Sequence, residues 1–218
     1  MKAEFWQERW QQGRIGFNQP TVNPLLIHYF NQLKLKKGSR VLVPLAGKSI
    51  DMLWLAQQGY EVIGIELVES AVIEFFAEQN SAVTITQPTK DSSIKNYQGQ
   101  LAGQTISLWA ADIFALSATD IGAIDAVYDR AALIAMPPEM RLSYSEQVIS
   151  LSDNAPQLVL TLNYQQNERA GPPFSINSTD IERYYGAHYS IKPLAQKPAT
   201  LNAAPDLTVT ESVWLLTP

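Results

Sequence analysis

Several short stretches of this sequence place chemically useful residues directly after apolar runs. A glycine-containing turn follows the first such run, and charged side chains follow three others. Ligands of parallel α/β sheets bind beyond the carboxyl ends of the strands. If the runs are strands of one such sheet, the backbone of the turn and the charged side chains meet in one crevice. The residues concerned are Leu45–Gly47, Glu66, Asp112, Ile113 and Arg130.

The order of elements around the first turn predicts such a sheet. Arg40–Leu45 is a short β-branched run that is typical of a buried strand. Ser49–Gln58 carries apolar residues at helical spacing and is closed by Gly59, and Glu61–Ile65 is a second buried strand. A strand, a loop, a helix and a strand in this order form a right-handed crossover between parallel strands. The sequence therefore predicts an α/β fold.

The rest of the chain continues this alternation. Thr84–Gln104 is predicted to be an irregular insertion, because it is polar and holds Pro88 and two glycines. No linker, repeat or low-complexity tract divides the sequence, so we expect a single domain over residues 1–218. The further predicted strands are Thr105–Ala110, Ile124–Tyr128, Gln157–Asn163, His188–Leu194 and Leu207–Leu216, and the further predicted helices are Ala3–Gln12, Asn23–Leu33, Glu69–Gln79, Pro137–Ser152 and Ser178–Tyr185.

Composition narrows the class of protein. The length of 218 residues fits one α/β domain, and a net charge of −5 argues against a nucleic-acid partner, because phosphate contacts need a basic face. The chain has no cysteine, which excludes disulfides, thiolate nucleophiles and thiolate metal sites. No segment approaches the roughly 18 apolar residues of a membrane span, and the N-terminus lacks an apolar signal core. We expect a soluble, cytoplasmic protein, monomeric by default, without a membrane partner.

Three kinds of nucleotide ligand compete for the predicted crevice. A phosphate-binding P-loop needs a glycine five positions before Gly47, where Leu42 stands inside the strand. The dinucleotide fingerprint needs three glycines, of which only Gly47 is present, and this disfavours a nicotinamide-dependent oxidoreductase. S-adenosylmethionine has no phosphate, so one glycine suffices for it. Its amino-acid end can meet the backbone of the turn, and Glu66 can accept both ribose hydroxyls. Asp112 and Ile113 can border the adenine.

Simpler interpretations compete with these roles. Glu66 and Asp112 could each be an exposed carboxylate after a strand, and Arg130 could be a surface arginine paired with Asp129. The aromatic side chains of the N-terminus could close over the crevice as a lid, or they could simply pack on the core; these are Trp6, Trp10 and Phe17.

Longer motifs run in order along nearly the whole chain. Phe5–Gln19 reads F-W-Q-E-R-W-Q-Q-G-R-I-G-F-N-Q, Val41–Ala56 reads V-L-V-P-L-A-G-K-S-I-D-M-L-W-L-A, and Asp129–Arg141 reads D-R-A-A-L-I-A-M-P-P-E-M-R. Shorter motifs are G-I-E at Gly64–Glu66, A-D-I-F at Ala111–Phe114 and G-P-P-F at Gly171–Phe174. The combination of W-x-x-x-W-x-x-G, V-P-L-x-G-K and D-R-x-A-L is specific. In these motifs the sequence resembles the thiopurine S-methyltransferase family in its bacterial form.

This resemblance implies a class I methyltransferase fold, in which a seven-stranded, mostly parallel sheet has helices on both faces and an antiparallel last pair. Residues 1–35 would form a helical flap over the cofactor site, with functional roles for Trp10 and Phe17 and core packing for Trp6. The residues implied to contact S-adenosylmethionine are Trp10, Leu45, Glu66, Ile113 and Arg130, together with the backbone of Gly47 and Asp112. The residues implied or predicted near the substrate are Phe17, Arg141, Pro172 and Tyr144, although the position of Arg141 on a helix favours a solvated residue.

The implied activity is methyl transfer from S-adenosylmethionine to the sulfur of thiopurines and other aromatic or heterocyclic thiols. Such thiols are largely ionised near neutral pH, so we predict no acid–base residue and no metal ion. An in-line displacement would then depend on orienting donor and acceptor and on excluding water. The chain departs from the family pattern at Asn18 and Ala46, and it has no arginine in Leu201–Leu207. Two alternatives stay open, namely a methyltransferase for selenium or tellurium compounds and a cofactor-binding protein without thiopurine turnover.

Overall fold

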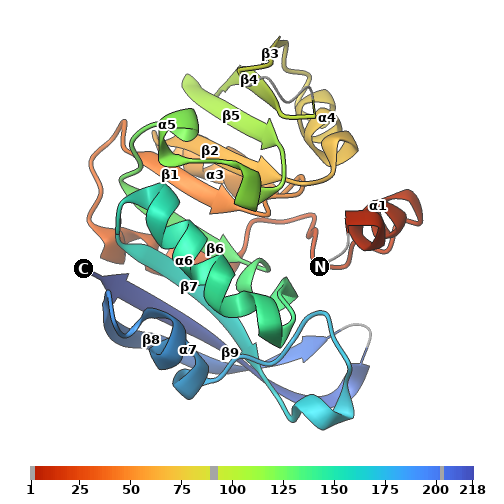
Figure 1. The fold of residues 1–218 in the computed structure, drawn as a ribbon, viewed down its shortest axis with the longest axis vertical. Helices are drawn as coiled ribbons and strands as arrows, with labels where there is room; N and C mark the ends of the chain where they lie inside the picture. The colour runs from red at the N-terminus through yellow and green to blue at the C-terminus, as the bar shows by residue number, and fades with distance from the viewer. Residues whose placement is uncertain (1–2, 89–92, 202–203) are drawn as a thin grey trace.

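Parallel strands form the centre of a nine-stranded sheet in this computed structural model, which describes residues 3–88, 93–201 and 204–218. The strand order is β3-β4-β5-β2-β1-β6-β7-β9-β8 (Figure 1). The run from β5 to β7 is parallel, and an antiparallel pair extends it at each edge. The strands are β1 (Arg40–Pro44), β2 (Glu61–Glu66), β3 (Val83–Thr86), β4 (Lys95–Leu101), β5 (Gln104–Ala110), β6 (Ala126–Arg130), β7 (Gln157–Asn163), β8 (Ser190–Leu201) and β9 (Ala204–Thr217).

Helices cover both faces of the sheet, because the central strands are apolar on both sides. In β1, Leu42 belongs to the core under α5, α6 and α7, whereas Val41 and Val43 belong to the core under α2, α3 and α4. The helices are α1 (Ala3–Gln11), α2 (Pro24–Tyr29), α3 (Asp51–Gln57), α4 (Glu69–Glu78), α5 (Ala118–Ile121), α6 (Arg141–Ser152) and α7 (Ser178–Tyr185), with short 3-10 turns at η1 (Phe30–Leu33), η2 (Ile113–Ala115), η3 (Leu133–Ala135), η4 (Pro138–Met140) and η5 (Gln166–Glu168). Within the described residues, no helix has the length and apolar character needed to cross a membrane.

The main departure from the predicted fold lies between α4 and β5. The sheet has nine strands rather than seven, because the stretch predicted as irregular contains β3 and β4; its residues 89–92 lie outside the described part. Strand β4 alternates, with Tyr97 and Gly99 buried and Gln98 exposed. Gly99 is needed for close packing, since a Cβ there would lie 2.8 Å from Cε1 of Phe76. The buried residues of β4 are thus a tyrosine and a glycine rather than the aliphatic residues that usually mark a strand, so the sequence of β4 does not show an apolar alternation.

Two predicted helices are interrupted. The predicted helix Pro137–Ser152 is a 3-10 turn followed by α6, and Asn23–Leu33 is α2 followed by a 3-10 turn. Leu26 and Phe30 of the second segment are buried in the sheet's core, whereas α1 lies apart from the sheet at the right of Figure 1. The single domain with a flap over residues 1–35 stays a prediction.

The buried carboxyl of Asp129, in the core under α6, should make the stability of the protein depend on pH. Its side chain is fully buried, and it accepts hydrogen bonds from the Tyr144 hydroxyl (2.7 Å) and the Leu133 backbone N–H (3.1 Å). Burial raises the pKa of Asp129 to about 6, and these hydrogen bonds offset part of the rise. A carboxyl whose pKa is raised on folding binds more protons in the folded state, so its contribution to stability is present below the unfolded pKa and is lost as pH rises through the folded value.

We therefore expect Asp129→Asn to change the pH dependence of stability. Relative to the variant, the wild-type free energy of unfolding should fall by about 2 kcal/mol between about pH 4 and pH 7. Urea unfolding of both proteins at the two pH values measures this difference. A constant difference between the two proteins would show that the carboxyl titrates alike in the folded and unfolded states.

Candidate active site

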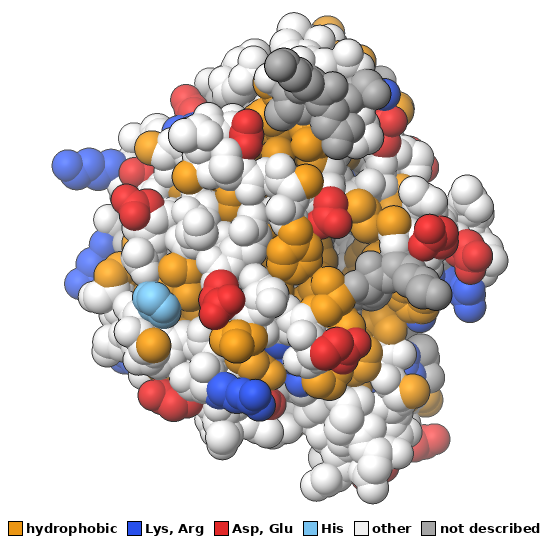
Figure 2. All heavy atoms as spheres, in the orientation of Figure 1, with side chains coloured by type: hydrophobic (Ala, Val, Ile, Leu, Met, Phe, Trp, Pro, Cys, Tyr) orange, Lys and Arg blue, Asp and Glu red, His pale blue; other side chains and the backbone are white. Residues whose placement is uncertain are grey.

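A cavity opens at the carboxyl ends of β1, β2 and β5, where the sequence predicts the crevice. Six of the predicted residues line it, and α1 and the loop after it close one side. Figure 2 shows hydrophobic side chains gathered over the middle of this face of the molecule. This cavity is called the donor cavity below, after the methyl donor that the sequence predicts for it. Its lining residues are Trp6, Trp10, Phe17, Leu45, Ile65, Glu66, Leu67, Ala111, Asp112, Ile113, Phe114, Ala131, Ala135, Met136 and Met140.

Glu66 is the central polar group of the donor cavity. It is buried at the end of β2 and accepts hydrogen bonds from the backbone N–H of Gly47 and of Val68, each at 2.8 Å. Burial raises the pKa of Glu66, and the N–H donors of Val68, Gly47 and Leu67 oppose this rise. A carboxylate offers about four acceptor positions, so lone pairs remain for a ligand. The simpler interpretation of an exposed carboxylate is wrong for Glu66.

The turn after β1 is built for close approach of its backbone. Leu45 and Gly47 both have positive φ angles, 48° and 53°. A Cβ at Gly47 would lie 3.2 Å from Cζ2 of Trp10, whose ring packs edge-on against Phe17 with centroids 5.8 Å apart. A side chain at Gly47 would therefore add backbone strain and press on the aromatic cover. Gly47 itself lines a small neighbouring cavity that Leu45 and Phe17 also line.

The charges of the donor cavity favour a cationic ligand over a phosphate. The ionisable side chains among its described lining residues are two carboxylates, Glu66 and Asp112, and no lysine or arginine is among them. One carboxylate oxygen of Asp112 accepts a hydrogen bond from the Phe114 backbone N–H at 3.0 Å. A pyrophosphate would meet uncompensated negative charge here, whereas a sulfonium with an adenosine group would meet carboxylates and aromatic rings. The residues present thus fit S-adenosylmethionine.

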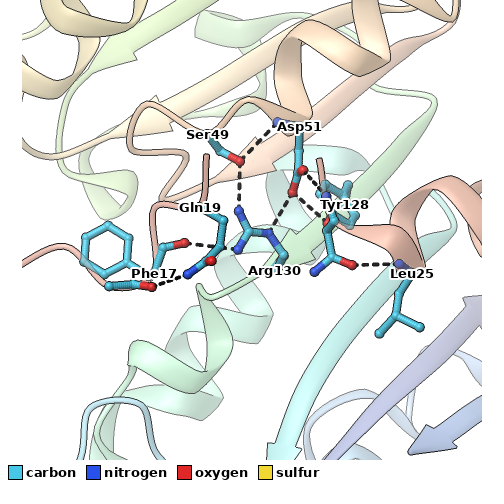
Figure 3. A network of polar contacts seen from close by, with 9 residues as sticks. Phe17, Gln19, Leu25, Ser49, Asp51, Tyr128 and Arg130 are labelled. Carbon is cyan, nitrogen blue, oxygen red and sulfur yellow. Dashed lines mark hydrogen bonds and ion pairs between the residues drawn. The ribbon is translucent and has the colours of Figure 1, made fainter. Parts of the chain in front are cut away.

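Arg130 belongs to a buried polar network beside the donor cavity (Figure 3). Its Nε lies 2.7 Å from a carboxylate oxygen of Asp51, and its two terminal nitrogens donate to the Ser49 hydroxyl (2.9 Å) and the Phe17 carbonyl (3.1 Å). Tyr128 also donates to the same Asp51 oxygen, at 3.0 Å. The simpler interpretation of a surface pair with Asp129 is wrong, because Asp51 is the partner. Arg130 therefore connects three parts of the site through hydrogen bonds, namely the turn after β1 at Ser49, α3 at Asp51 and the backbone of Phe17.

A second, larger cavity of about 690 Å³ adjoins the first and shares Trp6, Phe17, Ala131 and Ala135 with it. Pro172, which the sequence predicts near the substrate, lines this second cavity. Arg130, predicted to contact the cofactor, also lines the second cavity and is absent from the lining of the first. This second cavity is called the acceptor cavity below, after the substrate predicted beside Pro172. Its lining also includes Arg9, Arg14, Gln19, Ile134, Leu162, Arg169, Pro173, Thr200, Leu201 and Glu211.

Two predicted substrate residues lie outside these cavities. Arg141 is buried, with Nε donating to the Met136 carbonyl (3.0 Å) and its guanidinium 5.4 Å from the Phe174 ring centroid. It is therefore not a solvated helix residue, and Met136, whose carbonyl it holds, lines the donor cavity. Tyr144 is predicted from the sequence to line the acceptor site, but its side chain is fully buried and donates a hydrogen bond to Asp129. It is absent from the lining of the acceptor cavity.

Sequence reasoning missed several lining residues. Trp6, expected to pack on the core, lines both cavities, and Met136 and Met140 line the donor cavity. The sequence also predicts no role for Asp51. The available signal is its position, a carboxylate in the first turn of a helix with an apolar residue on each side. A carboxylate that is buried there needs a polar or charged partner.

Comparison with solved structures defines the fold class. The magnesium protoporphyrin IX methyltransferase of Synechocystis, solved with S-adenosylhomocysteine, superposes with a TM-score of 0.66 over all of both chains at 14% identity. The 1,6-didemethyltoxoflavin-N1-methyltransferase of Burkholderia thailandensis gives a TM-score of 0.65 at 14% identity, covering 99% of this chain and 87% of the other. The chain thus has the class I fold of S-adenosylmethionine-dependent methyltransferases.

Comparison of sequences gives the family. Residues 1–216 match the profile of the family "Thiopurine S-methyltransferase (TPMT)". A thiopurine S-methyltransferase of Psychrobacter cryohalolentis is 67% identical over 216 residues, which cover 99% of each chain. A thiopurine S-methyltransferase of Teredinibacter turnerae is 40% identical over 216 residues, covering 99% of this chain and 97% of the other. The chain belongs to the thiopurine S-methyltransferase family, so the resemblance in its motifs is confirmed.

Proposed function

We propose that this chain transfers the methyl group of S-adenosylmethionine to the sulfur of thiopurines and related aromatic thiols. The observation that carries the proposal is the arrangement of the two cavities. A donor cavity with a backbone-held carboxylate adjoins an aromatic-lined acceptor cavity, and Trp6 and Phe17 line both. Family membership and the charge of the donor cavity support the same conclusion.

The residues have mainly binding and positioning roles in this proposal. Bound S-adenosylmethionine supplies a methyl group on a positively charged sulfur. Glu66 accepts the ribose hydroxyls, and the backbone of Leu45–Gly47 meets the amino-acid end. Trp10 and Phe17 keep water out, which strengthens the electrostatic interactions inside the cavity, and Arg130 holds the Phe17 carbonyl at 3.1 Å. Because an aromatic thiol is already largely ionised, orientation of the two reactants takes the place of a general base.

A labelling experiment tests this proposal. Incubation with 6-mercaptopurine and S-adenosylmethionine labelled in its methyl group should give labelled 6-methylmercaptopurine. Calorimetry should show that S-adenosylhomocysteine binds and that NAD does not. Binding of S-adenosylhomocysteine without transfer to any aromatic thiol would leave a cofactor-binding protein, and binding of NAD alone would overturn the donor assignment as well.

A further inference from the structure

Helix α6 carries polar side chains that point into the protein at positions 141, 144 and 147. Successive members are three residues apart, so they form one row along the surface of the helix. Arg141 and Tyr144 are buried, and Gln147 is partly buried. None of the three is among the described lining residues of the donor or the acceptor cavity. Arg141, Tyr144 and Gln147 are called the α6 row below.

Gln147 holds the turn that borders one side of the donor cavity. Its Nε2 donates to the carbonyls of Ile113 (2.7 Å) and Leu116 (2.8 Å), at the two ends of η2. Ile113 and Phe114 of this turn line the donor cavity. A 3-10 turn has poor internal hydrogen-bond geometry, and here the bond from the Leu116 N–H to the Ile113 carbonyl is long, at 3.4 Å. The position of η2 therefore depends on the amide of Gln147.

The other two members of the row hold a second wall of the donor cavity. Tyr144 donates to Asp129 at 2.7 Å, and Asp129 accepts a hydrogen bond from the Leu133 N–H of η3 at 3.1 Å. Arg141 donates to the carbonyl of Met136, directly after η3, at 3.0 Å. Met136 lines the donor cavity. One helix thus fixes two segments of the cavity wall that follow different strands, β5 and β6.

Filling the core is a simpler role for the row, but apolar side chains would serve it better. A buried polar group costs free energy unless it is hydrogen-bonded, and the surrounding core contains apolar residues such as Val127, Val148 and Val159. Packing alone also holds η2 incompletely, because the side chain of Phe114 is 38% exposed. The hydrogen bonds of the row therefore act on backbone groups whose positions decide the shape of the donor cavity.

We propose that the α6 row positions the methyl donor, with Gln147 setting the turn that borders the adenine. Gln147 acts through the backbone of η2 and not by contact with the ligand. It fixes this backbone before the ligand arrives, so less conformational freedom is lost on binding. The inference rests on the proposed function for the identity of the ligand, but the binding of S-adenosylhomocysteine can be measured without any transfer step.

Gln147→Met tests the role of the two hydrogen bonds, since it keeps the length of the side chain and removes both N–H donors. Calorimetry should show that S-adenosylhomocysteine binds about tenfold more weakly, because two hydrogen bonds that hold the turn are lost. The KM for S-adenosylmethionine should rise likewise, whereas the KM for 6-mercaptopurine and kcat should stay unchanged. Glu146→Met, at the exposed neighbouring position of α6, is the matched control and should leave every value unchanged.

Gln147→Glu gives a readout that a loss of packing would not give. A protonated carboxyl can still donate to one of the two carbonyls, whereas an ionised carboxylate offers them only acceptors. Relative to the wild type, S-adenosylhomocysteine should therefore bind this variant more weakly at about pH 8 than at about pH 5. For Gln147→Met, the affinity relative to the wild type should be the same at both pH values.

The failure of this inference can be told apart from the failure of the proposed function. If the wild-type protein binds S-adenosylhomocysteine but methylates no thiol, the proposed function fails, and weaker binding by Gln147→Met still supports the α6 row. Wild-type affinity in Gln147→Met, shown by urea unfolding to be folded, overturns the inference, as does an equal rise in the KM values of donor and thiol. If Gln147→Met does not fold, Gln147→Glu decides, and a loss that is equal at both pH values overturns the inference. Absence of S-adenosylhomocysteine binding by the wild-type protein overturns both proposals.

Discussion

Glu66→Gln is expected to weaken the binding of S-adenosylhomocysteine by about tenfold to a hundredfold, since hydrogen bonds to a charged group are worth about 1.5–3 kcal/mol each. The side chain has two tasks. It holds the N–H groups of Gly47 and Val68, and it presents its remaining lone pairs to the ribose. An amide replaces one acceptor oxygen by an NH₂ donor, which faces either a backbone N–H or a ribose hydroxyl.

Glu61 provides the matched control, because it lies at the other end of the same strand. Its carboxylate is on the surface, 3.4 Å from Arg40, so Glu61→Gln should leave the affinity unchanged. Calorimetry measures the affinities, and thermal unfolding without ligand shows whether the turn has been disturbed. Wild-type affinity in a folded Glu66→Gln protein would mean that the ribose lies elsewhere.

The centre of this fold was predictable from the sequence because local pattern and burial agree there. Val41–Val43 and Val62–Ile65 are apolar on both faces, which is what a parallel strand covered on both sides requires. Turn residues fix where these strands end, and a parallel sheet brings those ends to one edge. Leu45, Glu66 and Ile113 each follow or end a predicted parallel strand, so the sequence alone predicts that they lie on one cavity.

The edges of the sheet and the partners of charged groups were not predictable in this way. Strand β4 is recognisable only once Gly99 is seen under Phe76, which is a contact between distant residues. The sequence neighbour Asp129 made a plausible partner for Arg130, yet its side chain is buried under α6 and bonds to Tyr144. Successive residues of a strand point to opposite faces, so adjacent Asp129 and Arg130 face different surroundings.

The same reasoning explains why the sequence does not reveal the arginines that line the acceptor cavity, Arg9, Arg14, Arg130 and Arg169. Arg9 and Arg14 are close along the chain, but Arg169 approaches them only through the loop after η5. A net charge of −5 gave no hint of a local concentration of positive charge. The donor cavity is acidic and the adjoining acceptor cavity is basic, so the two cavities should attract ligands of opposite charge.

Asp51→Asn is expected to lower the free energy of unfolding by about 3–5 kcal/mol, the usual cost of removing one partner of a buried ion pair. Asp51 has no exposed side-chain surface, and Arg130 is only 14% exposed, so water cannot readily replace the lost charge. Asparagine can still accept the hydrogen bond from the Asn23 backbone N–H, which is 2.8 Å in the wild type. The loss therefore reports chiefly on the uncompensated guanidinium of Arg130.

A double-mutant cycle distinguishes this cause from a general disturbance of α3. Arg130→Met alone leaves the Asp51 carboxylate unpaired and should also destabilise the protein, whereas Asp51→Asn/Arg130→Met should be less destabilised than the two single effects added together. Glu74→Gln is the control, because Lys48 keeps its contact with Glu78 at the surface, and it should cost no more than about 1 kcal/mol. Urea unfolding gives all four values. Additive effects in the cycle would show that Asp51 and Arg130 stabilise the protein independently, and the ion pair between them would then not be the cause of the loss.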